Sequence, residues 1–178
     1  MIYSFLLALK AKRIQVVIWG VLLVKLIIII PVIYSTTTRK IQAEVTSIRA
    51  EQQLPVLAQV AVGREVIELE VAGTNQQKAL GLMHRNVLAK NRGMLFSFMP
   101  SRVVKFWMKN VRIPLDIIFI QNGRVVAIAA AVPPCNTEFC PTYASGTKVN
   151  RVIELRGGRA AQLGLKVGDR LPIEFLID

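Results

Sequence analysis

The stretch that decides the fold is FWMKNVRIPLDIIFI, residues 106–120. Two apolar segments flank a turn that carries Lys109 and Arg112, and the second segment contains a single carboxylate, Asp116. A charged group among apolar side chains is costly unless it is paired or hydrogen-bonded. We therefore expect Asp116 to have a fixed partner, either backbone N–H groups of the turn or the side chain of Lys109 or Arg112.

The segments around this stretch predict a mainly β domain. Leu115–Ile120 is apolar on both faces, which is typical of a central strand, and Asn122-Gly123 favours a hairpin to the next strand. Further short strands are expected at 64–71, 94–98, 103–108, 124–132, 149–155 and 171–177, and short helices at 76–83, after an N-cap at Thr74, and at 159–163. The expected fold class is a compact sandwich or open barrel with two short helices, preceded by one N-terminal transmembrane helix.

Residues 14–34 are almost entirely apolar and are long enough to cross a bilayer as a helix. At about 1.5 Å per residue they span roughly 31 Å, against a hydrocarbon core of about 30 Å. Lys25 costs roughly 3 kcal/mol near the bilayer centre, which the surrounding Leu, Ile and Val residues outweigh. We expect an uncleaved anchor or signal-anchor. The alternative is a cleaved signal peptide, whose apolar region is usually only about 7–15 residues long.

This span divides the chain into four expected parts. They are a basic cytoplasmic N-terminus at 1–13, the transmembrane segment at 14–34, a polar stalk at 35–63 and a β domain at 64–178. Basic residues flank the span on both sides, and we favour a single-pass inner-membrane protein whose domain lies on the periplasmic side. The net charge of +12 does not indicate nucleic-acid binding, because the basic residues form no stripe with interleaved aromatics.

Two cysteines, Cys135 and Cys140, lie close together in PPCNTEFCPTY, residues 133–143. In an exported domain this pair favours a disulfide, which closes a tight loop and stabilises the fold by about 2 kcal/mol. Free or reactive thiols are the alternative. A zinc site needs four ligands, and the chain offers only these two thiols and His84, so we expect no metal and no cofactor.

Seven motifs occur in an order and spacing that resemble one known family. They are GLMHR (81–85), RGMLFSF (92–98), FWMKNVRIPLDIIFI (106–120), VVAI (125–128), CPTY (140–143), VIEL (152–155) and LGLKVGD (163–169). Together they resemble the DUF192 (COG1430) family over residues 64–176. The resemblance implies a compact, mainly β and often exported domain, and it implies no reaction. His84 departs from the family pattern, which usually has an aromatic or apolar residue there.

The candidate site is the turn within the quoted stretch. The residues that we expect to line a pocket mouth there are Trp107, Lys109, Asn110, Arg112 and Asp116. An aromatic face beside basic, amide and carboxylate groups is typical of a surface that holds a sugar or a peptide terminus. In the structural alternative, Asp116 only fixes the turn. Catalysis by Asp116 with Glu154 is a distant third hypothesis, because nothing in the sequence brings the two within the few Å that such chemistry needs.

The sequence therefore predicts a membrane-anchored, exported and non-catalytic binding module for a cell-envelope ligand: a glycan, a peptide or a protein. No GxSxG motif, P-loop or dinucleotide fingerprint is present to indicate a common catalytic class. The alternative function is a structural or accessory subunit of a membrane protein complex, docked through Lys25 and the basic face of the domain. A hydrolase that uses Asp116 is the remaining alternative.

Overall fold

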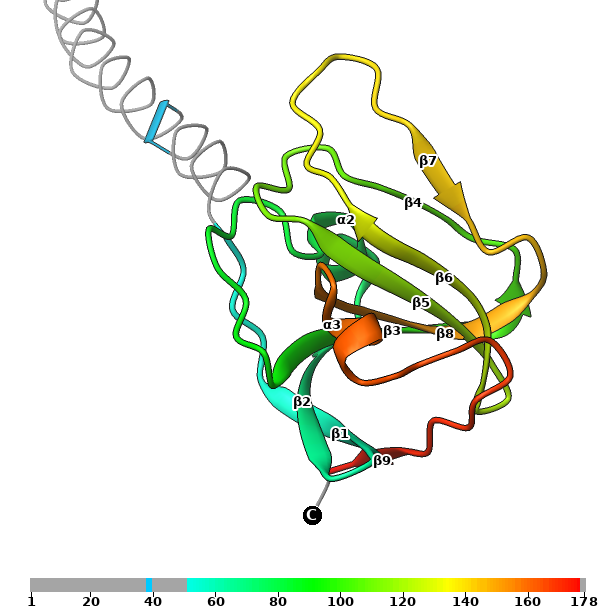
Figure 1. Cartoon of the computed structure of the whole chain (residues 1–178). Helices are drawn as coiled ribbons and strands as arrows, with labels where there is room; N and C mark the ends of the chain where they lie inside the picture. Colours follow the sequence, from blue (N-terminus) through cyan, green and yellow to red (C-terminus); the bar gives the residue numbers. More distant parts are fainter. Residues whose placement is uncertain (1–37, 40–50, 177–178) are drawn as a thin grey trace, which may run out of the picture. The chain divides into compact units, whose positions relative to one another are not determined.

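The computed structural model describes residues 38–39 and 51–176. The chain divides into two units, Met1–Ala50 and Glu51–Asp178, and almost all described residues belong to the second unit (Figure 1). None of the described helices is long and apolar enough to cross a membrane. The predicted span at 14–34 lies outside the described residues, and so do residues 35–37 and 40–50 of the predicted stalk at 35–63.

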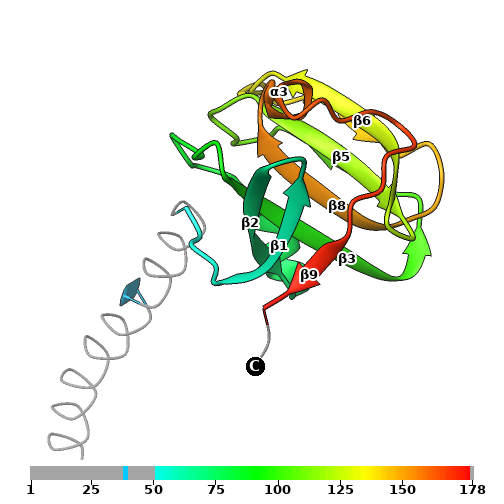
Figure 2. The same cartoon turned by 60° about the horizontal axis from the view of Figure 1, so that its bottom comes forward.

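Strands dominate the second unit. The strands are β1 (Val56–Val62), β2 (Glu65–Ala72), β3 (Arg92–Arg102), β4 (Lys105–Trp107), β5 (Leu115–Gln121), β6 (Arg124–Val132), β7 (Thr142–Ala144), β8 (Val149–Arg156) and β9 (Ile173–Phe175), and the helices are α2 (Asn75–Leu80) and α3 (Arg159–Gln162). One sheet has the order β6-β5-β8-β3-β2-β1-β9, which can be followed in Figure 2, and β4 pairs with β7 separately. The predicted mainly β fold with two short helices is confirmed. The sheet does not close into a barrel.

The connection between β2 and β3 contains α2. These two strands are parallel, and a parallel pair needs a crossover connection instead of a tight turn. Thr74 caps α2, as the sequence predicted: its hydroxyl accepts from the N–H of Gln77 at 3.1 Å, and the Gln77 side chain accepts from the N–H of Thr74 at 2.9 Å. This capping box satisfies N–H groups that the first helical turn leaves unpaired. The helix ends before Gly81, which has a positive φ of 48°.

The sheet begins earlier in the chain than the sequence patterns suggested. β1 lies within the range that we assigned to the stalk, and it pairs antiparallel with both β2 and β9. Ala58 and Val60 face the core, while Leu57 is 40 % exposed. This alternation is that of a half-buried strand, in which successive side chains point to opposite faces.

The central strands are buried on both faces, because a separate apolar cluster packs on each side of the sheet. On β5, Ile117 and Phe119 belong to one cluster and Ile118 and Ile120 to the other. Phe106 of β4 and the turn after α2 pack in the first cluster, and Ala160 of α3 belongs to the second. The two-sided burial explains the continuous apolar run at Leu115–Ile120.

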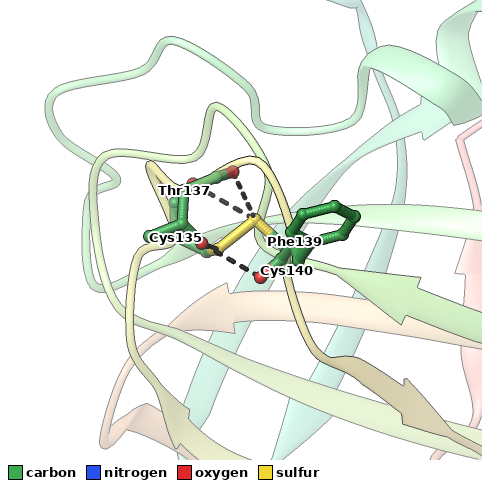
Figure 3. Close-up of a disulfide and its surroundings, with 4 residues drawn as sticks. All are labelled: Cys135, Thr137, Phe139 and Cys140. Atoms are coloured by element: carbon green, nitrogen blue, oxygen red, sulfur yellow. Dashed lines mark hydrogen bonds between the residues drawn. A yellow bond between two sulfur atoms is a disulfide. The ribbon is translucent and has the colours of Figure 1, made fainter.

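Cys135 and Cys140 form the predicted disulfide, with an S–S distance of 2.07 Å (Figure 3). The N–H of Cys135 donates to the carbonyl of Met108 at 3.3 Å, and Cys135 also forms an isolated β-bridge with Lys109. The loop that joins β6 to β7 is therefore fastened to the turn that follows β4.

Candidate functional site

Asp116, the carboxylate that stands out in the sequence, is fully buried on β5. Its Oδ1 accepts hydrogen bonds from the N–H of Ala131 at 2.6 Å and of Gly158 at 2.9 Å, and its Oδ2 accepts from the N–H of Ala160 at 2.6 Å. Asp116 thus has fixed partners, but they are not the turn at 109–112 or the basic side chains of that turn. Main-chain donors engage both oxygens, which is the environment of a structural carboxylate.

The local backbone explains why these N–H groups reach Asp116. The register of β5 against β6 shifts between Leu115 and Ile117, so β6 carries an extra residue opposite Asp116. Ala131 in this bulge has a positive φ of 47°. Gly158, the N-cap of α3, has no side chain that could accept from the first helical turn, and Asp116 supplies the missing acceptor from the neighbouring strand.

The other predicted site residues lie apart from Asp116. The Lys109 ammonium group is 5.6 Å from the centre of the Trp107 ring, which is a cation–π distance. Asn110 has a positive φ of 61°. The guanidinium of Arg112 donates to the side chain of Asn86 at 3.1 Å. The structure thus brings Trp107 and Lys109 together, and a role of these residues in ligand binding stays a prediction.

A cleft of about 440 Å³ opens between α2, β3 and β4. Trp107 lines it, whereas the other four predicted site residues do not. Its aromatic wall also contains Phe96, Phe98 and Phe106. The Phe106 ring packs edge-to-face against Phe96 at 5.2 Å, Phe98 at 6.4 Å and Phe119 at 6.1 Å between ring centres. This packing holds the wall in a fixed orientation.

Three basic side chains line the same cleft: Lys78 on α2, Arg102 on β3 and Lys105 on β4. The Lys78 ammonium group and the Arg102 guanidinium lie 5.4 Å and 5.0 Å from the centre of the Phe98 ring. Arg102 and Lys105 are exposed. Of the residues that line the cleft, Glu154 is the one acidic residue, so the outer part of the cleft favours an anionic group.

Glu154 on β8 is a buried carboxyl that sequence reasoning considered only as a partner of Asp116. Burial raises the pKa of Glu154 from 4.5 to about 8, although the positive charge of Arg85 lowers it in part. In β5 and β8, Asp116 lies opposite Leu155, while Glu154 lies opposite Ile117. The two carboxyls therefore point to opposite faces of the sheet, and an acid/base pair of Asp116 with Glu154 is excluded. The signal for Glu154 was one acidic residue in the otherwise apolar run VIEL, residues 152–155.

A buried ion pair connects the first residues of the domain to the sheet. Arg85 donates to both carboxylate oxygens of Glu70 at 2.7 and 2.6 Å, and it also donates to the carbonyl of Gln52. The N–H of Leu54 donates to Glu70 at 2.8 Å. A bidentate pair with further hydrogen bonds to the backbone is the geometry that makes a buried ion pair tolerable. Arg85 Nε is buried without a hydrogen-bond partner in the described part of the chain.

These features define a class of protein: a mainly β domain with an open seven-stranded sheet and a two-stranded sheet, and with a cleft of ligand size beside α2. The DUF192 family, described as uncharacterized ACR, COG1430, matches residues 58–173. The chain belongs to the DUF192 family. The matched range begins in β1 and ends in β9, so it contains every residue of the cleft.

Two solved structures are similar to this chain. One is a protein of unknown function from Novosphingobium aromaticivorans, with 36% identity and a TM-score of 0.60 over 69% of this chain and 92% of that chain. The other is described as a candidate transcription regulator from Sinorhizobium meliloti, with 33% identity and a TM-score of 0.59 over 66% and 91%. The comparison with curated proteins found no significant match.

Proposed function

We propose that the domain is a non-catalytic binding module for a cell-envelope ligand, which enters the cleft between α2, β3 and β4. One observation carries this proposal: aromatic walls and three cations line a single cleft of about 440 Å³. Clefts of roughly 300–1,000 Å³ with apolar walls and a few placed polar groups are typical of small-ligand sites. An anchor at 14–34 would hold this module at the periplasmic surface of the inner membrane.

The lining of the cleft favours a ligand with an apolar part and an anionic part. Trp107 is 48 % exposed and lines the cleft, so its ring is available to the apolar part. Lys78, Arg102 and Lys105 are suited to a carboxylate, because an ammonium or guanidinium group forms charge-assisted hydrogen bonds with it. Short peptides with a free C-terminus and acidic glycans of the envelope both have this chemistry.

A thermal unfolding screen of the full-length chain in detergent tests the proposal. The panel contains peptidoglycan fragments, acidic oligosaccharides and short peptides. A ligand at 100 times its dissociation constant adds about 2.7 kcal/mol, which raises Tm by several degrees. We expect a hit that Trp107→Ala and Arg102→Met weaken and that Lys166→Met, an exposed control outside the cleft, leaves unchanged. A hit that is equally strong in all three variants would place the ligand elsewhere.

A second candidate function is an accessory subunit of a membrane protein complex. Phe139 favours it, because this ring is 86 % exposed in the disulfide loop, and exposed aromatics are enriched at protein interfaces. Crosslinking in membranes followed by purification should then recover one stoichiometric partner, and Phe139→Ser should lose it. Recovery of the chain alone, from cells in which crosslinking of a known complex succeeds, would contradict this function.

A further inference from the structure

The floor of the cleft is the carboxyl of Glu154, the one buried polar side chain among the residues that line it. The residue is 5 % exposed, and its Oε2 is enclosed without a hydrogen-bond partner in the described part of the chain. Gly81 lies beside it: a Cβ atom there would be in van der Waals contact with Oε2, at 3.7 Å, and with the Phe96 ring, at 3.6 Å. An ionised carboxylate in this position would carry charge on an unsatisfied oxygen, which is costly.

Arg85 is the charged group that could stabilise an ionised Glu154, but its two terminal nitrogens are engaged by both oxygens of Glu70 and by the carbonyl of Gln52. Its Nε is buried without a hydrogen-bond partner among the described residues, so it makes no hydrogen bond to Glu154. Burial therefore dominates, and it raises the pKa of Glu154 to about 8 against the opposing charge of Arg85. At neutral pH the floor of the cleft is an uncharged carboxylic acid.

A protonated carboxyl has one O–H donor, whereas an ionised carboxylate can only accept. Buried acids that are kept neutral in this way act as hydrogen-bond donors to carbonyl oxygens. An ammonium group of a ligand would instead require the charged form of Glu154. A ligand carboxylate is better placed near the exposed cations Arg102 and Lys105 than at the enclosed floor.

We propose that the protonated carboxyl of Glu154 is the hydrogen-bond donor of the cleft. It donates from Oε1, since Oε2 is enclosed, to an amide carbonyl of a short acylated peptide, whose free carboxylate is held by Lys78, Arg102 and Lys105. This inference rests on the proposed function and names its ligand class. The apolar side chains of the peptide then pack on the wall formed by Phe98 and Trp107.

The donor disappears when Glu154 ionises, so binding weakens as the pH rises through about 8. The residues opposite Glu154 in the sheet are Met94 on β3 and Ile117 on β5, and neither is charged. The charged groups that line the cleft are Lys78 on α2, Arg102 on β3 and Lys105 on β4. The buried ion pair of Arg85, after α2, with Glu70 on β2 lies nearby. His84 follows Met83 in the turn after α2. Glu154→Gln keeps all of these groups and removes only the titrating carboxyl, so a pH dependence that this variant loses reports on Glu154.

Trp107 supplies the readout, because it lines the cleft and the chain has only two tryptophans. Trp19→Phe leaves Trp107 as the single tryptophan of the full-length chain in detergent, and its emission is excited selectively over that of the tyrosines. The probe is N-acetyl-leucyl-leucine, titrated at pH 7 and at pH 9. We expect its Kd to rise about tenfold at pH 9, because the protonated fraction of Glu154 falls by about that factor. In Glu154→Gln, whose amide also donates, the Kd should be the same at both pH values.

Two related probes separate the parts of the ligand. The C-terminal amide of the same peptide lacks the carboxylate, so it should bind more weakly and keep the pH dependence. Leucyl-leucine has an ammonium group in place of the acetamide, and it should bind more weakly than the acetylated probe. Tighter binding of leucyl-leucine, or binding that strengthens with pH and is lost in Glu154→Gln, would overturn the proposal in favour of a charged acceptor.

The remaining outcomes distinguish this inference from the proposed function. Equal, pH-independent binding of the acetylated peptide in wild type and Glu154→Gln would overturn the role of Glu154 and leave the cleft as a binding site. Binding that Arg102→Met leaves unchanged would contradict the cleft itself. No fluorescence change up to about 10 mM probe, where even weak complexes form, would overturn the ligand class. Thermal unfolding of Glu154→Gln at pH 7 confirms that the variant is folded.

Discussion

The carboxyl of Asp116 on β5 accepts a hydrogen bond from the N–H of Ala160 in α3 at 2.6 Å, between residues that are 44 positions apart in the chain. Together with the bonds from Ala131 and Gly158, it fastens α3 and the bulge of β6 to the central strand. The side chain that stands out in the sequence is therefore a structural centre of the domain, and it lies outside the cleft.

Asp116→Asn should destabilise the domain without affecting the cleft. The asparagine amide offers a donor where the aspartate accepts, so at least one buried N–H group loses its partner, and we expect a loss of about 2–4 kcal/mol. The matched control is Asp169→Asn, whose Oδ2 accepts a single bond at 2.8 Å from the N–H of the exposed Lys166. Denaturant unfolding should show a loss below about 1 kcal/mol for this control. Equal losses in both variants would contradict the structural role.

Glu154 should make the folded domain less stable at alkaline pH. Its pKa is 4.5 in its ordinary state and about 8 when folded, so the folded state holds a proton that the unfolded state releases. The stabilisation is complete below about pH 4.5 and is lost as the pH rises to about 8, at roughly 1.4 kcal/mol per pH unit. Glu154→Gln should remove this decline, so the variant should exceed the wild type in stability at pH 9.

The control for this pH dependence is Glu138→Gln, an exposed residue of the disulfide loop. Free energies of unfolding measured at pH 5, 7 and 9 should fall equally in the wild type and in this control. If Glu154→Gln shows the same decline, another group causes the pH dependence.

Glu70→Gln should be far more costly than Glu68→Gln, although the two residues lie two positions apart on β2. Glu70 and Arg85 form a 2.6 Å ion pair with side chains that are 6% and 5% exposed, and the removal of one buried partner costs about 3–5 kcal/mol. Glu68 and Arg92 form a 3.2 Å pair with side chains that are 43% and 40% exposed, and such a pair contributes at most about 1 kcal/mol. Denaturant unfolding measures the free energy of unfolding of both variants. Similar losses would contradict a buried, water-excluded pair of Glu70 and Arg85.

Reduction of the disulfide should lower stability by about 2 kcal/mol, because it returns conformational freedom to the unfolded chain between Cys135 and Cys140. The double variant Cys135→Ser, Cys140→Ser should have the same lowered stability in the presence and absence of a reductant. A wild type that unfolds at the same denaturant concentration with and without reductant would contradict a stabilising bond.

The sequence was most informative where a local pattern decides the structure. The capping box at Thr74, the central strand at Leu115–Ile120 and the short Cys135–Cys140 loop each depend on residues close together in the chain. Their preferences agree with the final fold, which is why local reasoning succeeded.

Contacts between distant segments could not be predicted in the same way. The partners of Asp116 come from a bulge in β6 and from α3, and nothing in the turn at 109–112 indicates either. Glu154 lies in the apolar run VIEL, and its position in the cleft depends on how α2 and β4 pack over that face. The sequence patterns placed β1 in the stalk. Its outward-facing residues are not clearly polar, so the alternation in which Ala58 and Val60 face the core is difficult to see in the sequence.

The most direct test of the account compares two lysines four residues apart. Lys105 lines the cleft, whereas Lys109 packs on Trp107 outside it. The measurement is the Kd of the first ligand found in the screen, for Lys105→Met and Lys109→Met in the full-length chain. The cleft predicts that Lys105→Met weakens binding severalfold, as expected for a lost charge-assisted hydrogen bond of about 1 kcal/mol or more, and that Lys109→Met binds like the wild type. The reverse result would contradict the cleft and return the site to the turn at 109–112.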